Sequence, residues 1–414
     1  MRRIVIIGGG TAGTLAANRL RRALPVEAAD IVVVDADDRH VYQPGLLFVP
    51  FGKARPEDLV RPRRAQLRPS IDFRRVAVDQ VSTDRNEVLL AGGDILCYDI
   101  LIIASGAALL PEETEGLTGP GWMERVFTFY DLPGAIGLAA ALDRFTGGRL
   151  VINVIDLPIK CPVAPLEFGF LADEYFRRRG LRDRVEIRYV TPLDGAFTKP
   201  AVSRELGGLL ADKGIELVTE FNTGEVDGTT GKLVSYDGRE EAFDLAVVVP
   251  LHGGAGYMSR SPGLGDELGF VSCDERTLVA KASPDVFVIG DAAGLPASKA
   301  GSVAHFEGEV LVRNVLRRLA GEPPDAVFDG HANCFIESGF GKALLIDFNY
   351  DTEPLPGRFP SRVGLPLLRQ SRLNHLGKLA FSRLYWHVLL PGREIPGVPS
   401  RMPVTGKHIT GKGH

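Results

Sequence analysis

The sequence has few cysteines and no long apolar run, and each shortage excludes a class of protein. Four cysteines in 414 residues are too few and too widely spaced for a disulfide framework or a zinc site with paired ligands. No stretch approaches the roughly 18 to 20 consecutive apolar residues of a membrane-spanning helix. The apolar start MRRIVIIGGG is broken by glycines, and no small-residue cleavage site follows it. We therefore expect a globular chain without a metal site, a structural disulfide, a membrane span or an export signal.

Composition and charge set the scale of the fold. With 45% hydrophobic residues, the chain can bury a large core and should divide into about two or three domains. The net charge of −4 is uneven, because ten Lys or Arg residues but only one acid, Glu394, follow from Arg358 onward. Such a tail favours an anionic partner, or it is a basic face solvated or packed on the acidic body. No basic and aromatic pattern indicates a nucleic-acid-binding module.

The N-terminal segment predicts a dinucleotide-binding βαβ unit. An apolar strand at 4–7 is followed by G-x-G-x-x-G, a helical stretch to about Ala23 and a second strand, Ile31 to Val34. In such a unit the glycines allow a tight turn, close approach of a pyrophosphate and helix-to-strand packing, while the helix N-terminus faces the phosphates. An acid at the end of the second strand can accept hydrogen bonds from the ribose hydroxyls. The residues predicted to bind the dinucleotide here are Gly8, Gly10, Thr11, Ala12, Gly13 and Asp35.

Two later segments identify the dinucleotide. The stretch 98–106 reads YDILIIASG, and the stretch 286–292 reads VFVIGDA. They resemble the two signature segments of the large FAD-binding reductase superfamily, in which the aspartate of the second segment binds the ribityl chain. This resemblance implies FAD as the cofactor. It adds Ala104, Gly106, Gly290 and Asp291 to the predicted cofactor-binding residues.

A second α/β unit is predicted between about residues 149 and 250. Its expected elements are strands at 150–155, 185–190, 215–220 and 245–249, with helices at about 163–178 and 203–213. The turn after its first strand, DLPIKCPVAP at 156–165, contains no glycine. Because side chains and prolines fill the space that a pyrophosphate needs, nicotinamide binding is disfavoured at this turn.

This turn instead carries Cys161. A preceding lysine, Lys160, and a position at a helix N-terminus are both predicted to lower a thiol pKa and to favour the reactive thiolate. The alternative is a buried structural cysteine that follows a strand. Cys334 lies in a turn-rich segment after the FAD-binding domain closes. Cys97 and Cys273 lie in apolar strand patterns and are assigned to the core.

Three segments then resemble the sulfide:quinone oxidoreductases, most closely their type III-like members. They are KCPVAPLE at 160–167, KAGSVAH at 299–305, and NCFIE at 333–337 continuing to Lys342. The resemblance implies that Cys161 and Cys334 form a redox pair that is attacked by sulfide and passes electrons through FAD to quinone. It also implies that Lys299, Gly301 and Lys342 lie near the flavin, although each lysine is equally compatible with a solvated surface position.

One position departs from the family. Many relatives have a third cysteine in the segment equivalent to 120–135, where this chain has none and Tyr130 and Asp131 stand instead. We therefore do not expect covalent attachment of FAD or long polysulfide chains on the protein. The two-cysteine mechanism is unaffected.

The C-terminal segment predicts an amphipathic helix. Leu373, Leu376, Ala380, Phe381, Leu384 and Val388 recur at helical spacing, with basic residues and the aromatic pair Tyr385 and Trp386 beside them. This pattern suits a helix lying on an anionic membrane surface, or one packed on the protein's own core. Phe340, Phe381 and Trp386 are candidate quinone contacts. His305 and His331 are candidate proton carriers, or structural histidines.

Together these observations predict an α/β fold with two Rossmann-like dinucleotide-binding domains and a C-terminal amphipathic, membrane-docking segment. The predicted boundaries are 1–110 with 255–330 for the FAD-binding domain, 111–254 for the second domain and 331–414 for the C-terminal segment. We expect a cytoplasmic enzyme held peripherally on the inner face of the cell membrane. The alternatives are an NADH:quinone dehydrogenase-like flavoenzyme, a soluble flavocytochrome-type sulfide dehydrogenase subunit and an FAD-binding redox sensor. The oligomeric state stays open, a homo-oligomer included.

Overall fold

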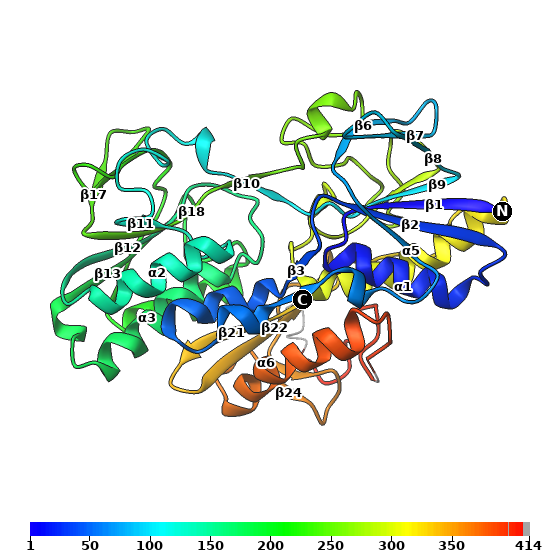
Figure 1. Ribbon diagram of the computed structural model, residues 1–414. Coiled ribbons are helices and arrows are strands. Elements are labelled where there is room, and N and C mark those ends of the chain that lie inside the picture. Colours follow the sequence, from blue (N-terminus) through cyan, green and yellow to red (C-terminus); the bar gives the residue numbers. More distant parts are fainter. Residues whose placement is uncertain (396, 409–414) are drawn as a thin grey trace.

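Two parallel sheets organise the molecule, as the computed structural model in Figure 1 shows for residues 1–395 and 397–408. The first sheet has the order β20-β9-β1-β2-β5. Its strands are β1 (Arg2–Ile7), β2 (Ala29–Asp35), β5 (Asp72–Arg75), β9 (Ile100–Ile103) and β20 (Val286–Val288). Ile4 to Ile7 are almost completely buried, as expected for a parallel strand covered on both faces. Helices α1 (Thr11–Ala23) and α5 (Gly301–Leu319) lie side by side next to this sheet.

The second sheet has the order β11-β18-β12-β13-β14 and is also parallel. Its strands are β11 (Val126–Phe127), β12 (Gly148–Val154), β13 (Val185–Val190), β14 (Ile215–Val218) and β18 (Leu245–Val249). Its helices are α2 (Leu132–Arg144), α3 (Ala164–Arg178) and α4 (Pro200–Asp212). The predicted strands at 185–190 and 245–249 are confirmed to the residue, and the predicted helix at 163–178 begins one residue later. Pattern reading therefore located both dinucleotide-type sheets.

Each parallel sheet is the centre of one structural unit, and smaller antiparallel pieces complete the two units. They are β3 (Arg39–Val41) with β4 (Val60–Pro62), β6 (Val78–Ser82) with β7 (Glu87–Leu90) and β8 (Ile95–Cys97), β10 (Ala108–Leu110) with β19 (Leu251–Gly253), and β15 (Thr223–Asp227) with β16 (Lys232–Ser235) and β17 (Glu240–Ala242). The assignment of Cys97 to the core was wrong, because Cys97 is exposed while Cys273 is buried. Side chains alternate along a strand, and on β8 it is Leu96 that points inward.

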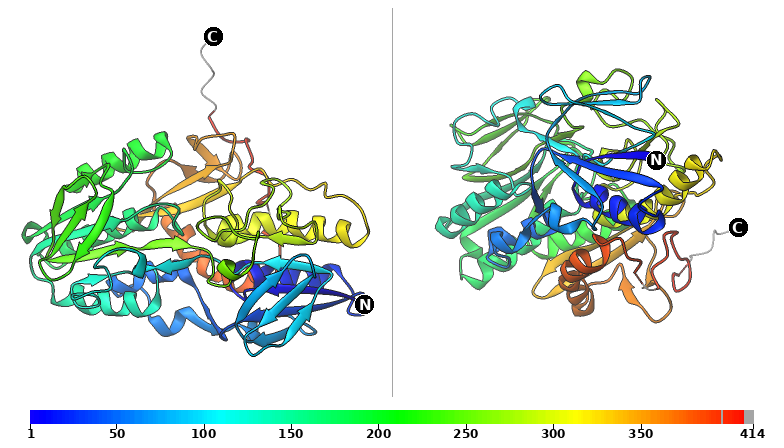
Figure 2. Two further views of the ribbon diagram at one scale, coloured as in Figure 1. Left: turned by 90° about the horizontal axis from the view of Figure 1, so that it is seen from above. Right: turned by 45° about the vertical axis from the view of Figure 1, so that its right-hand side comes forward.

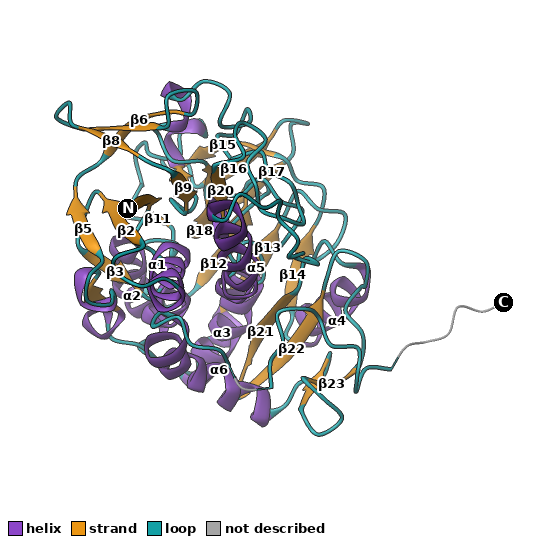
Figure 3. Ribbon diagram, turned by 90° about the vertical axis from the view of Figure 1, so that its right-hand side faces the viewer, coloured by secondary structure: helices purple, strands orange, loops and turns teal. Residues whose placement is uncertain are grey.

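The C-terminal segment is a hairpin and a helix that span the lower side of both units (Figure 1). Strands β21 (Ala332–Gly339) and β22 (Lys342–Phe348) pair antiparallel, followed by β23 (Gly357–Phe359), β24 (Leu365–Leu367) and α6 (Arg372–Leu384). β21 packs on α3 and α6 packs on β22, an arrangement that Figures 2 and 3 show from other sides. Cys334 therefore lies within a strand and not in a turn. Among the residues that the structure describes, no helix is long and apolar enough to cross a membrane.

Candidate active site

A single cavity lies where the first sheet, α3 and α6 meet. The turn after β1, the start of α1 and the end of β2 contribute Gly8, Gly10, Thr11, Ala12 and Asp35. The segments that follow β9 and β20 contribute Ala104, Gly106, Gly290, Asp291, Lys299 and Gly301. The turn before α3, α3 itself and α6 contribute Lys160, Cys161, Glu167, Lys378 and Phe381. Segments far apart in the sequence thus place most of the predicted cofactor residues and one predicted redox cysteine around one space.

The glycine loop allows a ligand to come close to the protein backbone. Gly8 has φ +100°, and a Cβ there would lie 2.4 Å from the Ala104 carbonyl oxygen. A Cβ on Gly13 would lie 1.8 Å from the Gly8 carbonyl oxygen, so Gly13 packs the helix against the loop and does not line the cavity. A Cβ on Gly10 would meet no atom of the protein within 4 Å. The first N–H groups of α1, which has no side-chain cap within the described chain, are therefore free to bind an anionic pyrophosphate. This donor set fits the phosphates of a dinucleotide.

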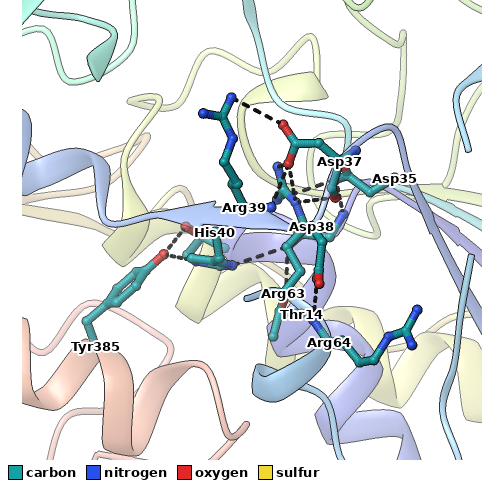
Figure 4. Close-up of polar contacts among 11 residues, drawn as sticks. Thr14, Asp35, Asp37, Asp38, Arg39, His40, Arg63, Arg64 and Tyr385 are labelled. Atoms are coloured by element: carbon teal, nitrogen blue, oxygen red, sulfur yellow. Dashed lines mark hydrogen bonds and ion pairs between the residues drawn. The ribbon is translucent and has the colours of Figure 1, made fainter. Parts of the chain in front are cut away.

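Asp35 is the last residue of β2 and lies beside this loop. Its Oδ2 accepts a hydrogen bond from the Gly9 N–H at 2.7 Å, and Arg63 Nη1 lies 3.4 Å from the same oxygen. Figure 4 shows this group of charged side chains together with Tyr385 and with His40, which the sequence did not single out. Asp35 thus braces the loop while still lining the cavity.

Lys299 and Glu307 hold the second FAD-type segment from behind. Lys299 Nζ donates to the carbonyl oxygens of Asp291 at 2.8 Å and Ala293 at 3.0 Å, and it lies 3.9 Å from the ring centroid of Phe270. Glu307 Oε2 accepts from the Gly290 N–H at 2.6 Å. Burial raises the pKa of Glu307 to about 8 and also raises the pKa of Asp291. Buried acids and a lysine therefore fix the Gly290–Asp291 turn, which lines the cavity.

The turn after β12 is closed by backbone contacts to the first unit. Cys161 has φ +46°, a left-handed conformation that costs a residue with a side chain about 1 to 2 kcal/mol. Its N–H donates to the Lys299 carbonyl at 2.7 Å. Its carbonyl oxygen accepts from the Ala164 N–H at 2.9 Å and from the Tyr130 hydroxyl at 3.2 Å. The turn thus occupies the place where a glycine loop would open, and it holds the thiol at the cavity wall.

The prediction that Cys161 has a lowered pKa was wrong. Burial and then the nearby Glu167 carboxylate raise the pKa of the Cys161 thiol to about 12, although the Lys378 charge and the hydrogen bond from the Ala164 N–H lower it. The physical reason is that α3 begins at Ala164, after the thiol, and that burial lowers the pKa of Lys160 itself. Burial also raises the pKa of Cys334, with the charge of Cys161 as the next cause. The two cysteines are thiols close enough to influence each other's ionisation.

A buried charged network adjoins the two thiols. Lys378 on α6 pairs with Glu167 on α3, and its Nζ also donates to the Phe335 carbonyl at 3.2 Å. Glu167 Oε1 accepts the Glu337 N–H at 2.6 Å, and His375 Nδ1 lies 2.8 Å from Glu337 Oε1. The sequence marked Lys378 only as a basic flank of the helix. Two features could have indicated that Lys378 points inward. It lies one turn from His375, and it does not share the helical face of the leucines of α6.

Several predicted residues lie elsewhere. Lys342 and Phe340 are exposed at the β21–β22 turn, outside the cavity lining, so the structure does not bring Lys342 near the other cofactor residues. Trp386 is only 5% exposed and packs edge-on against His40 at 5.4 Å between ring centroids. It therefore does not line the cavity and does not face solvent as an interfacial aromatic.

The two candidate proton-carrying histidines are also not among the residues that line the cavity. His305 pairs with Arg19 at 3.0 Å, and burial with the Arg19 charge lowers its pKa to about 3. His331 is fully buried beside Asp347, with Nε2 2.9 Å from Oδ1. Their contacts are structural, and neither lines the site.

Comparisons with known proteins agree with this geometry. Residues 2–135 match the family described as pyridine nucleotide-disulphide oxidoreductase. The chain is 25% identical over 400 residues to "Sulfide:quinone oxidoreductase, mitochondrial" of Mus musculus, covering 94% of this chain and 86% of that protein. The protein of the same name from Dictyostelium discoideum is 26% identical over 398 residues, with the same coverage. The solved sulfide:quinone oxidoreductase of Aquifex aeolicus has a TM-score of 0.80 at 18% identity, covering 95% of this chain and 92% of that one, so the fold is shared.

The chain is therefore an α/β oxidoreductase with the fold of the solved sulfide:quinone oxidoreductase, and its first 135 residues are similar to the pyridine nucleotide-disulphide oxidoreductases. Within that class it is a homologue of the sulfide:quinone oxidoreductases, along nearly its whole length. The predicted resemblance to the sulfide:quinone oxidoreductases is confirmed.

Proposed function

We propose that this chain oxidises sulfide through Cys161 and Cys334 and delivers the electrons through FAD to a membrane quinone. The observation that carries the proposal is the single cavity in which the dinucleotide loop, the Gly290–Asp291 turn and Cys161 all take part. FAD, when bound, supplies an acceptor for an electron pair. The residues that would hold it are Gly8, Gly10, Thr11, Ala12, Asp35, Ala104, Gly106, Gly290, Asp291, Lys299 and Gly301.

The sulfur step needs the two cysteines, an acceptor for one electron pair and a nucleophile that takes up sulfur. Oxidation of the two thiols releases an electron pair and two protons and forms a Cys161–Cys334 disulfide. Hydrosulfide then attacks Cys334, so that a new sulfur–sulfur bond forms, the disulfide breaks, and Cys161 leaves as a thiolate. A nucleophile such as a second hydrosulfide takes the outer sulfur and leaves Cys334 as a thiolate. The two cysteines can then be oxidised to the disulfide again, with FAD, when bound, as the acceptor that would pass the electron pair on to quinone. We assign the attack to Cys334 because Cys161 is the cysteine that lines the cofactor cavity.

Lys378 supports this step electrostatically. A leaving thiolate at Cys161 is unfavourable, since burial and Glu167 raise the pKa of that thiol. The Lys378 ammonium is the charge that opposes them, and its own pKa is raised by Glu167 and Cys161 despite the opposing effect of burial. A fixed cation in a dry site stabilises developing negative charge. We therefore propose that Lys378 stabilises the Cys161 thiolate and that Glu167 holds the lysine in place.

The exposed face of α6 supports docking on a membrane. Leu373, Leu376, Leu379 and Leu384 are between 36% and 59% exposed, so this apolar stripe is not packed on the core. Arg372 and Arg383 lie on the same helix. An apolar stripe flanked by cations suits the interface of an anionic bilayer. We propose peripheral attachment at the inner face of the cell membrane, with quinone approaching past Phe381, which lines the cavity.

The chemistry is tested by mixing the FAD-loaded protein anaerobically with sulfide and a short-chain quinone, and following flavin bleaching and quinone reduction. Wild type should turn over with sulfide but not with NADH. Cys161→Ser and Cys334→Ser should each reduce turnover by at least about a thousandfold while FAD stays bound. Cys97→Ser, a control at an exposed cysteine outside the cavity lining, should match wild type. Reduction by NADH alone would favour the dehydrogenase alternative, and a single stoichiometric oxidation without turnover would favour the redox sensor.

Membrane docking is tested by co-sedimentation with vesicles of anionic or of neutral lipid. Leu376→Glu should abolish binding to anionic vesicles, because it places a charge in the apolar stripe. Ile136→Glu is the matched control, since Ile136 is 45% exposed on α2. Equal binding of both variants would rule out α6 as the docking element.

A further inference from the structure

The turn that follows α6 reaches back to the glycine loop at the other end of the chain. Tyr385 begins a π-helical turn, Tyr385–Leu389, and is only 1% exposed. Its hydroxyl lies 2.6 Å from Thr11 Oγ1 and 2.6 Å from His40 Nε2. His40 Nδ1 in turn lies 3.2 Å from the Gly9 carbonyl oxygen. Figure 4 shows His40 between Tyr385 and the charged group around Arg63.

The direction of each hydrogen bond in this chain follows from chemistry. The Gly9 carbonyl can only accept, so His40 Nδ1 carries the proton. Burial, with help from the Arg63 charge, lowers the pKa of His40 to about 4, so the ring is neutral and Nε2 accepts. The Tyr385 hydroxyl must then donate to Nε2. Its oxygen accepts from the Thr11 hydroxyl, and the order is Thr11 to Tyr385 to His40 to Gly9.

This chain of hydrogen bonds fixes the glycine loop on both sides of Gly10. Gly9 and Thr11 flank Gly10, where a Cβ would project into the cavity without meeting the protein. The Gly9 carbonyl also accepts from Thr14 Oγ1 at 3.0 Å, which uses its second lone pair. The backbone N–H groups at this turn are consequently held in one orientation, as binding a phosphate with preorganised donors requires.

The π turn is itself firmly docked on the first unit. Tyr385 packs against Tyr42 at 4.8 Å between ring centroids. The Arg61 guanidinium lies 4.2 Å over the ring of Trp386. Asn18 on α1 donates from Nδ2 to the Leu390 carbonyl at 2.6 Å. Helix α6 leads directly into this π turn and carries Lys378 and Phe381 into the cavity. The glycine loop, the π turn and α6 therefore form one connected body.

We propose that Tyr385 is a positioning residue for the cofactor, which holds the phosphate-binding loop in its binding conformation through the chain to His40, Gly9 and Thr11. The C-terminal segment is then part of the dinucleotide site. Because coupling is reciprocal, FAD binding in turn stabilises α6, the helix assigned to the membrane. The proposal rests on the FAD binding of the proposed function and is independent of its sulfur chemistry.

The direct test is the affinity of the apoprotein for FAD, measured by the quenching of flavin fluorescence during titration. Tyr385→Phe removes one oxygen and keeps the ring contacts. It should raise the dissociation constant about tenfold, since it leaves a Thr11 donor and a His40 acceptor unpaired. Tyr350→Phe is the matched control, because its hydroxyl donates to the Glu275 carbonyl at 3.4 Å, outside the cavity lining. Equal affinity of wild type and Tyr385→Phe would overturn the inference, whereas a wild type that binds no FAD would overturn the proposed function.

Hydrogen exchange separates positioning from simple structural support. In wild type, FAD should slow the exchange of amides in 372–390, and in Tyr385→Phe this protection should be lost while Tyr350→Phe keeps it. His40→Gln should show the same loss. Combining it with Tyr385→Phe should weaken FAD binding no more than the stronger single variant, as expected for residues acting as one unit. Full protection of 372–390 in both single variants, or fully additive losses of affinity, would contradict the proposed coupling.

Discussion

The two turns that follow β1 and β12 occupy the same place in two similar parallel sheets, and they have opposite character. The first is built of glycines, is open to the cavity at Gly10 and presents helix N–H groups. The second is built of prolines and large side chains, and its Cys161 N–H is bonded to the Lys299 carbonyl at 2.7 Å. One framework therefore presents helix N–H groups where the turn is open and a thiol where it is closed. The difference between the two units resides in the turn and not in the sheet.

The largest expected effect comes from closing the open turn. Gly8→Ala should lower the free energy of unfolding by about 3 kcal/mol or more and abolish FAD retention, because its Cβ would lie 2.4 Å from the Ala104 carbonyl oxygen at φ +100°. Gly207→Ala on α4 is the control, since a Cβ there meets nothing within 4 Å. It should be neutral or stabilising by about 0.5 to 1 kcal/mol. Urea unfolding and the flavin absorbance of the purified protein measure both effects.

The second effect is acid destabilisation through the histidines beside the two turns. His40 Nδ1 donates a hydrogen bond to the Gly9 carbonyl of the first turn, and burial lowers the pKa of His40 to about 4. His252 lies near the second turn, and burial, then the Lys160 charge, lower its pKa to about 3. Below the unfolded pKa of 6.5 the unfolded chain binds more protons than the folded one, so stability is complete above that pH and is lost as the pH falls toward 4.

For His40 alone this loss amounts to up to about 3 kcal/mol at the acid end. Unfolding free energies between pH 7 and 4 should therefore decline less steeply in His40→Gln than in wild type. His387→Gln, at an exposed histidine of the π turn, should leave the slope as it is. Parallel curves for wild type and His40→Gln would show that His40 is not held neutral.

The third effect concerns the thiol in the closed turn. In the reduced apoprotein near neutral pH, iodoacetamide should label Cys97 at least about tenfold faster than Cys161, because the raised pKa of about 12 leaves little thiolate at Cys161. Cys97 is exposed. Peptide mapping by mass spectrometry gives both rates in one sample. Faster labelling of Cys161 would restore the activated thiol that the sequence predicted.

The smallest effect is the strain stored at Cys161. Its φ of +46° favours glycine, so Cys161→Gly should be about 1 kcal/mol more stable than Cys161→Ala, with both variants inactive toward sulfide. Thermal unfolding of the two variants measures the difference. A more stable alanine variant would mean that the turn carries no such strain.

The regular elements and the first turn could be predicted from the sequence, whereas the contacts between distant segments could not. Apolar periodicity located β13, β18 and α3 because buried strands and amphipathic helices leave local patterns. The partnership of His40 with Tyr385 spans 345 positions, and nothing local encodes it. The resemblance alone predicted that Lys342 lies near the flavin. The packing of α6 on β22 decides that Lys378, and not Lys342, reaches the cavity.

The course of the chain beyond the last aromatics was harder to predict than their direction. Tyr385 lies seven residues after Lys378, so a regular helix places both side chains on one face, away from the exposed leucines. The chain then widens into a π turn, with the Leu390 N–H bonded to the Tyr385 carbonyl at 3.0 Å, which shifts the side chains that follow around the axis. The wide turn has no sequence signature of its own, so the burial of Leu389 and Leu390 required the structure.

The bond between the Cys161 N–H and the Lys299 carbonyl restricts how the molecule can work. It joins the turn after β12 to the segment before α5 at the wall of the cavity. A hinge that swung one unit away from the other would have to break this bond and carry Cys161 off the cavity wall. On the proposed mechanism we therefore expect this bond to stay intact while electrons leave the thiols.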